Sequence, residues 1–439
     1  MGKVFKVELP VIGKIVALKI LDPDPLLVEL MGMERLKALF LHEAVTMAGL
    51  NHKNIVAVND FDEDDGKPFF VMDFLANNLG IVMGESYKVD KPSRAVLVDK
   101  ALHYSIQTLN GLDCLHDAGI VHRDIKPFNL LINAQDTIKI CDFGLSKLRN
   151  ETFEGPANLN VGSPYYAAPE QEADPDSADV RADLYPVGVM LYRMLTRRFP
   201  YRSDHGSDYI PASRLNPELD GQWDIFLETA LAREPGQRFT NASAMRTALT
   251  ELQEHWHKQK EMSCALLEPQ DDTRKTASVP PLRTLRFSPI KIRPKEAIAR
   301  FNLNRLWQPK TYAANDFEEQ RALLLKDRAT GLVWQKSGSP YPCTWHAAHA
   351  YIRRLNNDKF CGIDRWRLPT VEELTSLLIA NPRGKTMCIE SEFDDTQRWV
   401  WSCDRQSFVS AYYIDIELGF VAWQDFSAPY YVRAVSSDD

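Results

Sequence analysis

The sequence has no excess of basic residues. Its 439 residues include 52 Lys and Arg against 60 Asp and Glu, so the formal net charge is -8 at pH 7. A protein that binds nucleic acid usually carries a basic excess or a basic patch, because it must neutralise phosphates. We therefore expect no nucleic-acid partner.

Long apolar runs are missing as well. No stretch approaches the roughly 18 apolar residues of a membrane-spanning helix, and residues 1–10 lack the apolar centre of a signal peptide. The seven cysteines are scattered, and no two of them form a C-x-x-C pair. Disulfide frameworks and structural zinc sites depend on paired cysteines. We therefore expect a cytoplasmic protein without a membrane span, whose cysteines are free thiols.

What is present divides the chain into three parts. Hydrophobic residues make up 44% and charged residues 26%, which is ordinary for domains with full cores. Residues 1–256 alternate apolar runs with turn signals and end in a helix-like stretch. Residues 257–306 are punctuated by proline and rich in Lys and Arg, which predicts a linker that cannot order alone and acts as a tether. Residues 307–439 are rich in Trp and short mixed segments, which predicts a separate C-terminal domain.

The stretch from Gly119 to Ile132, GIVHRDIKPFNLLI, combines polar groups with apolar flanks. It places Asp124, Lys126 and Asn129 next to residues that belong in a core. A core does not tolerate such groups unless they have partners, and a surface loop has no need of the apolar flanks. The stretch therefore indicates a functional loop at the edge of a core.

Further motifs accompany this loop at fixed spacing. Asp142-Phe-Gly begins ten residues after Ile132, Ala168-Pro-Glu begins 26 residues after Asp142, and Lys19 lies in the tetrapeptide V-A-L-K. Together with His-Arg-Asp124, these motifs resemble those of protein kinases of the bacterial Ser/Thr type, over residues 1–256. The resemblance implies an α+β, bilobal kinase fold with a β-rich small lobe and a helical large lobe.

The resemblance also implies the catalytic side chains. Asp124 accepts or orients the proton of the substrate hydroxyl, and Lys126 neutralises the γ-phosphate during transfer. A lysine at this place goes with Ser/Thr rather than Tyr substrates. Asn129 and Asp142 offer hard oxygen ligands, which suit Mg²⁺.

A second group of residues is expected to bind ATP. Lys19 holds the α- and β-phosphates, and Glu43 on the next helix pairs with it. Met72 borders the adenine pocket, although plain core packing is compatible with the same location. The backbone of Asp73 and Leu75 bonds the purine. The expected cofactors are therefore ATP and Mg²⁺, and the expected partners are proteins with Ser or Thr.

One element of the family is missing. The glycine-rich loop that covers the phosphates is present only as its tail, at Gly2-Lys-Val4, and the strand before it is absent. We interpret this as a start lost upstream, because every residue for the chemistry is retained. The alternative is an enzyme that works with a bare edge strand. In either case the small lobe is expected to lack its first strand.

Other departures concern regulation and specificity. The loop phosphate that Arg123 receives in the family would fall within residues 155–160, which contain no hydroxyl. Thr152 lies just outside this window, and Ser163 stands where the family has a substrate-positioning Thr. Activation by loop phosphorylation is therefore not expected. Phe128 replaces a Glu of some arginine-directed kinases, which weakens the case for a strongly basic target.

The C-terminal part contains five characteristic segments in order: DRATGLVWQK from residue 327, TWHAAHAY from 344, WRLPTVEEL from 366, VWS from 400 and YVR from 431. They resemble a bacterial domain of unknown function that is found also at the end of a collagen-like adhesin. Its fold is similar to that of C-type lectins and formylglycine-generating enzymes, a mixed α+β fold. Family membership supplies no chemistry, so the ligand or partner of this domain stays open.

The aromatic residues of this domain are expected in its core rather than on a ligand platform, because aromatics carry much of the burial in a small domain. His346 and His349 lie three residues apart on an expected helix. They can hold a metal only with further ligands, and no third ligand is evident in the sequence.

Two functions remain open. In the first, the chain is an active Ser/Thr kinase whose C-terminal domain senses a ligand or recruits a substrate. In the second, it is a nucleotide-binding pseudokinase that scaffolds partners through that domain. The two differ in whether phosphoryl transfer takes place.

Overall fold

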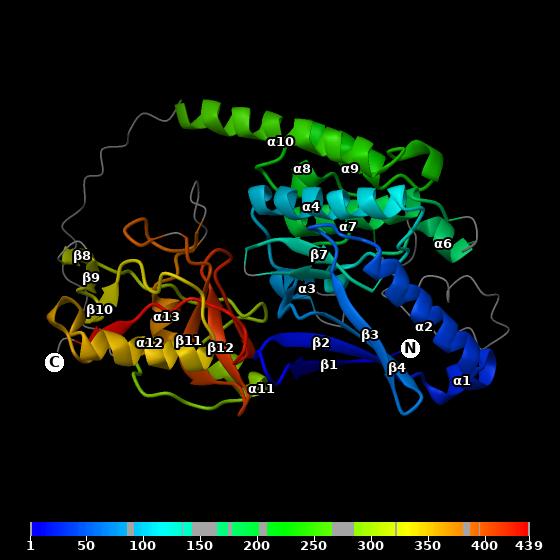
Figure 1. Cartoon of the computed structure of the whole chain (residues 1–439). Helices are drawn as coiled ribbons and strands as arrows, with labels where there is room; N and C mark the ends of the chain where they lie inside the picture. The colour runs from blue at the N-terminus through cyan, green and yellow to red at the C-terminus, as the bar shows by residue number, and fades with distance from the viewer. Residues whose placement is uncertain are drawn as a thin grey trace. The chain divides into compact units, whose positions relative to one another are not determined.

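The computed structural model of the chain describes residues 2–85, 92–133, 135–142, 165–173, 178–201, 209–265, 285–320, 323–380, 387–394 and 396–437. The chain divides into two compact units, Met1–Glu268 and Pro269–Asp439 (Figure 1). We refer to them as the N-terminal unit and the C-terminal unit. In the described parts of both, no helix is long and apolar enough to cross a membrane.

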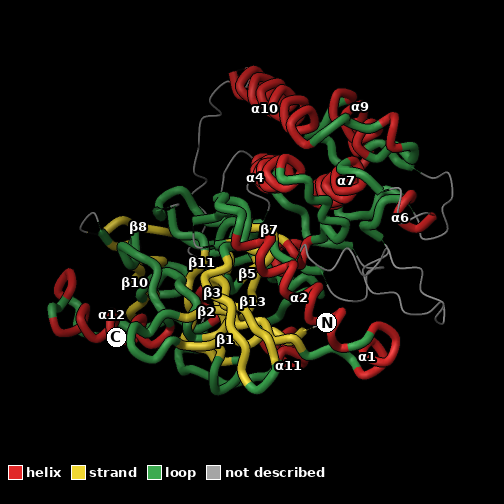
Figure 2. Tube along the Cα trace, turned by 45° about the vertical axis from the view of Figure 1, so that its right-hand side comes forward, coloured by secondary structure: helices red, strands yellow, loops and turns green. Residues whose placement is uncertain are grey.

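The N-terminal unit begins with an antiparallel sheet in the order β1-β2-β4-β3. Figure 2 draws strands in yellow and labels β1, β2 and β3 of this sheet. Its strands are β1 (Gly2–Glu8), β2 (Ile15–Leu21), β3 (Val58–Asp64) and β4 (Lys67–Asp73). The β3–β4 hairpin turns at Asp65 and Gly66, whose φ angles are 48° and 73°. An Asp-Gly pair favours this two-residue turn. β1 and β3 lie at the two edges of the sheet.

Two helices follow β2: α1 (Pro25–Met31) and α2 (Met33–Ala48). α1 begins where the Asp24 side chain accepts a hydrogen bond from the Leu26 N–H at 2.9 Å, which satisfies an otherwise unpaired donor of the first turn. α2 packs its buried face on the sheet, and the rings of Phe40 and Phe70 lie 5.1 Å apart. Glu43 lies on the same buried face of α2 and so points toward the sheet.

The rest of the N-terminal unit is mainly helical. Its helices are α3 (Leu79–Met83), α4 (Val98–Asp117), α6 (Pro169–Ala173), α7 (Arg181–Thr196), α8 (Ala212–Leu215), α9 (Gly221–Ala230) and α10 (Ala242–Ala265), with 3-10 turns at Pro127–Asn129 and Pro235–Gln237. α4 lies against both α7 and α10 (Figure 1). α7 is buried on almost every side. At Gly188 an added Cβ would lie 2.9 Å from the Cβ of Ala230, so glycine permits the close approach of α7 and α9.

A small antiparallel sheet frames the loop with the polar groups. It consists of β5 (Asn77–Asn78), β6 (Leu130–Ile132) and β7 (Ile138–Ile140). β6 follows the loop directly, and β7 ends two residues before Asp142. The hairpin of β6 and β7 therefore brings Asp142 back beside the loop that begins at His122.

The C-terminal unit is a mixed α+β domain with two antiparallel sheets, in agreement with the expected fold class. One sheet has the order β14-β10-β9-β8 and the other the order β11-β12-β13. The strands are β8 (Phe317–Gln320), β9 (Leu324–Asp327), β10 (Leu332–Gln335), β11 (Trp399–Arg405), β12 (Ser410–Asp415), β13 (Phe420–Asp425) and β14 (Val435–Ser437). The helices are α11 (Pro294–Arg300), α12 (Trp345–Asn357) and α13 (Val371–Ser376), with a 3-10 turn at Phe360–Gly362.

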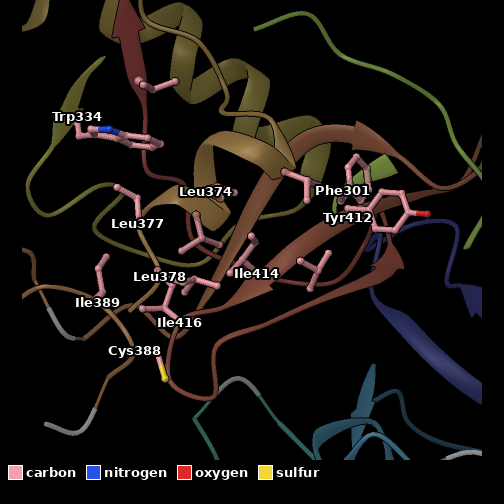
Figure 3. Close-up of a cluster of buried hydrophobic side chains, with 14 of the residues drawn as sticks. Phe301, Trp334, Leu374, Leu377, Leu378, Cys388, Ile389, Tyr412, Ile414 and Ile416 are labelled. Carbon is pink, nitrogen blue, oxygen red and sulfur yellow. The ribbon is translucent and has the colours of Figure 1, made fainter. Parts of the chain in front are cut away.

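The core of this unit lies between α13 and the β12 strand (Figure 3). Leu374 of α13, Leu377 directly after this helix and Ile414 of β12 contribute to it. The expectation that the Trp residues belong to the core is confirmed for four of them: Trp334, Trp366, Trp399 and Trp401 are all buried. Trp423, by contrast, is 37% exposed.

The expected linker at 257–306 is wrong at both ends. At the start, α10 continues to Ala265. At the other end, residues 285–303 are part of the C-terminal unit and contribute to its core. Ala297 and Leu303 are fully buried, and Phe301 is part of the core in Figure 3. Apolar area in this segment is therefore buried after all, because its contacts come from strands far along the chain.

Arg286 shows why the basic residues of this segment misled the prediction. Its guanidinium donates to both carboxylate oxygens of Asp404, at 2.9 and 2.6 Å, and also bonds Glu372. Asp404 is fully buried and accepts the Ile290 N–H at 2.8 Å as well. The linker prediction places the charge of Arg286 in solvent, but in the structure this charge is half of a buried ion pair with Asp404.

Candidate active site

The loop between α4 and β6 begins with a buried histidine. The Nε2 atom of His122 lies 3.1 Å from the carbonyl oxygen of Cys141, and Nδ1 lies 3.2 Å from the backbone nitrogen of Asp124. A carbonyl only accepts and a backbone N–H only donates, so Nε2 carries the proton and the ring is neutral. Burial lowers the pKa of His122, which agrees with a neutral ring. His122 thus ties Asp124 to the residue before Asp142.

The N-terminal unit is expected to lose stability as the pH falls below about 6.5. The pKa of His122 is lowered from its ordinary value of 6.5, so the unfolded chain takes up a proton that the folded chain does not. Linkage therefore favours unfolding as the pH falls from 6.5 toward the folded pKa, and the stability is complete above 6.5. Thermal unfolding of the wild type and of His122→Gln across this range is the measurement. Equal slopes for the two proteins would contradict the assignment.

Asp183 of α7 holds the backbone of the same loop. Its carboxylate accepts the N–H of His122 at 2.7 Å and that of Arg123 at 2.6 Å, and the Nε2 of His116 lies 2.9 Å from it. Arg123 has a φ of 64°, an unfavourable conformation for a residue with a long side chain. The two backbone bonds to Asp183 offset this strain and fix the position of Asp124.

The three polar groups of the loop contact one another. The Nζ of Lys126 lies 2.7 Å from Oδ2 of Asp124. The amide nitrogen of Asn129 donates to the carbonyl oxygen of Asp124 at 2.8 Å and to its Oδ2 at 3.1 Å. The amide oxygen of Asn129 therefore points away from Asp124. The loop thus presents the carboxyl group of Asp124 beside the amine of Lys126 and the side-chain amide of Asn129.

Lys19 joins three elements of the N-terminal unit. From β2, its Nζ lies 2.8 Å from Oε1 of Glu43 on α2 and 2.8 Å from Oδ1 of Asp142 after β7. Burial opposes the charge of Lys19, but the two carboxylates outweigh it and raise its pKa. Burial likewise opposes the charge of Asp142, and Lys19 lowers its pKa overall. Lys19 and Asp142 therefore carry opposite charges at neutral pH.

The residues expected to bind the purine lie at the end of β4. Met72 is buried and pairs with Ala17 of β2, two residues from Lys19. The N–H of Asp73 donates to the carbonyl oxygen of Ala57 at 3.2 Å. This N–H is thus already bonded within the protein. Leu75 is half-buried and follows directly in the segment that leads to β5.

Arg238 and Glu170 form a bidentate ion pair. The two guanidinium NH groups donate to the two carboxylate oxygens, each at 2.7 Å. Arg238 also lies over the ring of Tyr185 and donates to backbone carbonyls. This bidentate pair anchors the segment that begins at Ala168.

Sequence reasoning missed what Phe128 does. The prediction treated it only as the loss of an acid, but its half-buried ring packs on α3. A Cβ added at Gly80 would lie 2.7 Å from this ring, so the contact requires glycine. No local pattern signals such a contact between two segments 48 positions apart. The predictions for Thr152, Ser163 and residues 155–160 lie outside the described residues.

The two histidines of α12 do not form part of a visible metal site. The ring of His349 lies 4.3 Å from that of Trp345 in an edge-to-face contact, and His346 also contacts Trp345. In the portion of the chain that the structure describes, no three His, Cys, Asp or Glu side chains gather in a way that could hold an ion. Six cysteines are free thiols: Cys114, Cys141, Cys343, Cys361, Cys388 and Cys403.

Comparison with known proteins gives two family matches. Residues 1–255 match the family described as protein kinase domain, and residues 324–436 match the Lcl C-terminal domain. The second match agrees with the resemblance to the end of an adhesin.

Individual relatives are bacterial Ser/Thr kinases by name. The probable serine/threonine-protein kinase PknB of Lactococcus lactis is 32% identical over 219 residues, which are 48% of this chain and 34% of that protein. Serine/threonine-protein kinase pkn3 of Myxococcus xanthus is 32% identical over 270 residues, 57% of this chain and 47% of that protein. The chain thus spans between about a third and a half of the length of these relatives. The crystal structure of the Mycobacterium tuberculosis PknI kinase domain has a TM-score of 0.43 and 26% identity, over 57% of this chain and 91% of that one.

Proposed function

Because the chain belongs to the protein kinase family, we propose that it transfers the γ-phosphoryl group of ATP to Ser or Thr hydroxyls of proteins. The observation that carries the proposal is the double contact of Lys19 with Glu43 and Asp142, together with an Asp124 that Lys126 and Asn129 hold in place. Phosphoryl transfer depends on positioning and charge neutralisation, which these contacts provide.

In this proposal the acceptor hydroxyl binds beside Asp124. The carboxylate orients the hydroxyl and takes its proton while the oxygen attacks the γ-phosphorus, and the bond from phosphorus to the leaving ADP oxygen breaks. Lys126, 2.7 Å from the same carboxylate, neutralises the charge of the transferring group. Asn129 keeps Asp124 in its orientation through its amide nitrogen.

The residues also fit a divalent cation. Asp142 is ionised at neutral pH, and the amide oxygen of Asn129 points away from Asp124. A carboxylate and an amide oxygen are hard donors of the kind that Mg²⁺ prefers. We therefore assign Asn129 and Asp142 as its ligands; the bound cation would neutralise phosphate charge. Lys19, kept charged by Glu43 and Asp142, would bind the α- and β-phosphates.

The purine is assigned to the end of β4. Met72 would border the adenine, and the backbone of Asp73 and Leu75 would bond it. Since the N–H of Asp73 is already bonded to Ala57, its carbonyl oxygen is the group for the ligand. The retention of every polar residue of the machinery favours transfer over a pseudokinase scaffold.

The direct test is transfer of label from γ-labelled ATP with Mg²⁺, to the chain itself and to a general protein substrate. Labelled phosphoserine or phosphothreonine is expected after hydrolysis, without phosphotyrosine. If the purified protein binds ATP but labels no protein at all, the active-kinase proposal fails and the scaffold reading replaces it.

We assign the C-terminal unit a role in recruitment or ligand sensing, not in the chemistry. All groups named above come from the N-terminal unit. A tethered domain raises the local concentration of what it binds without touching the ATP site.

Residues 1–268 alone are therefore expected to phosphorylate a short peptide within about threefold of the full chain, because removing a tether changes local concentration only. Limited proteolysis should yield the two units as stable fragments, and peptide assays on each are the measurement. Precipitation of the 1–268 fragment, or loss of its nucleotide binding, would instead make the C-terminal unit a structural part of the catalytic unit.

A further inference from the structure

A cavity of about 90 Å³ lies in the C-terminal unit, and the proposed mechanism does not use it. One part of its wall is the segment that follows α11, with Asn302 and Thr311, and another part is α13, with Thr375 and Ser376. A water molecule in a cavity needs roughly 10–15 Å³. The cavity therefore has room for about six to nine groups of that size, which is the space of a small metabolite.

Two side chains of opposite charge, Arg300 and Glu372, also line the cavity. Nη1 of Arg300 lies 4.0 Å from Oε1 of Glu372, which is too far for a hydrogen bond, and the Arg300 side chain is 51% exposed. Glu372 is held more firmly, because Nε of Arg286 donates to its Oε1 at 3.1 Å and Arg286 is itself bonded to the buried Asp404. The cavity thus offers a guanidinium that can donate to a ligand and a carboxylate that is already fixed in place.

The neutral polar groups of the cavity divide into donors and acceptors in the same way. The amide nitrogen of Asn302 donates to Oγ1 of Thr311 at 3.2 Å, so the Thr311 hydroxyl can donate its own proton elsewhere. The hydroxyls of Thr375 and Ser376 donate to carbonyl oxygens of their own helix, at 3.0 and 2.7 Å, and their oxygen atoms can still accept. A donor therefore accompanies Arg300, and acceptors accompany the carboxylate on α13.

This arrangement disfavours a ligand that carries charge of one sign only. An anion at Arg300 would also meet the carboxylate of Glu372, and a cation at Glu372 would meet the guanidinium, so each would be repelled by the other group. A molecule with a carboxylate next to an ammonium group has a partner for both charges. The rest of the lining includes apolar residues such as Phe301 and Ala313, which suit a short side chain.

We propose that the C-terminal unit binds a small α-amino acid in this cavity, with the ligand carboxylate on Arg300 and Thr311 and the ligand ammonium group on Glu372. The inference rests on the ligand-sensing role proposed for this unit and names the class of ligand. Binding itself requires neither ATP nor phosphoryl transfer. Alanine and serine have the size that the cavity admits, whereas tryptophan is too large.

Calorimetric titration of the full chain with L-alanine and with L-serine is the first test. A Kd below about 1 mM is expected for at least one of them, since both ligand charges find partners. Acetate and methylammonium carry one charge each and should bind about tenfold more weakly or worse, and L-tryptophan should bind no better than they do. If neither amino acid binds, or if acetate binds as tightly as L-alanine, the proposal is overturned.

Arg300→Gln removes the charge that the ligand carboxylate needs. Because the side chain is half exposed and makes no hydrogen bond to Glu372, the fold should not depend on it. The affinity for the amino acid should fall about tenfold or more, the range for a hydrogen bond to a charged group. Arg305→Gln is the matched control, since Arg305 is an exposed arginine of the same segment and is not among the residues that line the cavity. An equal affinity of the two variants for the amino acid would contradict the assignment of Arg300.

Ala313→Leu tests the space and not the charges. The larger side chain fills part of the cavity from an apolar position and leaves Arg300 and Glu372 as they are. Affinity for the amino acid should fall about fivefold or more, the lower end of the cost of overpacking. Thermal unfolding of the variant shows whether it is folded. A folded variant with the affinity of the wild type would mean that the ligand binds elsewhere, which overturns the proposal.

The failure of this inference can be told apart from that of the proposed function, because the titrations contain no ATP. If the wild type transfers phosphate and binds no amino acid, only the ligand assignment fails. If it binds the amino acid through Arg300 and transfers no phosphate, the kinase function fails and the binding site stands.

Discussion

Asp124→Asn is expected to lower the rate of phosphoryl transfer by about 10²- to 10⁴-fold, the range for loss of a positioned general base. The variant keeps the shape of the side chain, and the backbone carbonyl of residue 124 still accepts from Asn129. What is lost is the negative charge that takes the hydroxyl proton and faces Lys126. Nucleotide affinity and melting temperature should therefore change little, while kcat falls.

The measurement is the initial rate with γ-labelled ATP, alongside nucleotide binding by calorimetry and thermal unfolding. Asp117→Asn is the matched control, since Asp117 is an exposed carboxylate at the end of α4, seven residues from Asp124. It undergoes the same chemical change and should keep the wild-type rate. If Asp124→Asn retains more than about a tenth of the rate, Asp124 does not act as the base.

Asp142→Asn is expected to abolish transfer by a different route, through the cation. Lys19 lowers the pKa of Asp142 and so keeps it ionised, and the variant replaces that charge with a neutral amide. The apparent affinity for Mg²⁺ should fall by about 100-fold or more, because even outer-shell changes at metal sites cost 10- to 100-fold. Lys19 retains its partner Glu43 at 2.8 Å, so the fold should survive.

Titration of nucleotide binding with Mg²⁺ separates the two variants. Asp124→Asn should bind the magnesium–nucleotide complex like the wild type, whereas Asp142→Asn should bind it only at much higher Mg²⁺. The charge on Asp142 persists down to pH values below 3.8, where its folded pKa lies, so the wild type should show no loss of Mg²⁺ affinity from this group at neutral or mildly acidic pH. Equal Mg²⁺ dependence of both variants would contradict the assignment of Asp142 as a ligand.

The sequence could bring Asp124, Lys126 and Asn129 together because their contacts are short-range in the chain. Asp124 bonds Lys126 two residues on and Asn129 five residues on, so one loop carries the whole constellation. Lys19 and Asp142 are 123 residues apart, and only the resemblance to a family, not any local pattern, placed them together.

Contacts without a family motif remained out of reach. Tyr166 and Glu85 are 81 residues apart, and neither lies in a pattern that marks a partner. Arg286 meets Glu372 and Asp404 at separations of 86 and 118 residues. Read locally, Arg286 belongs to a basic, proline-punctuated stretch, and the prediction of an unstructured linker followed from that composition. Composition counts charges but does not show their partners.

The packing of residues 285–303 determines how long a segment must be transferred to another protein for the C-terminal unit to fold there. The recognised family begins at residue 324, yet the segment before it supplies Phe301 and Leu303 to the core and Arg286 to the fully buried Asp404. A module cut at the family boundary would leave that carboxylate without its cation and the core open along one side. Gene fusions that transplant this domain should therefore carry about forty residues more than the family match covers, because the transplanted piece needs them to fold.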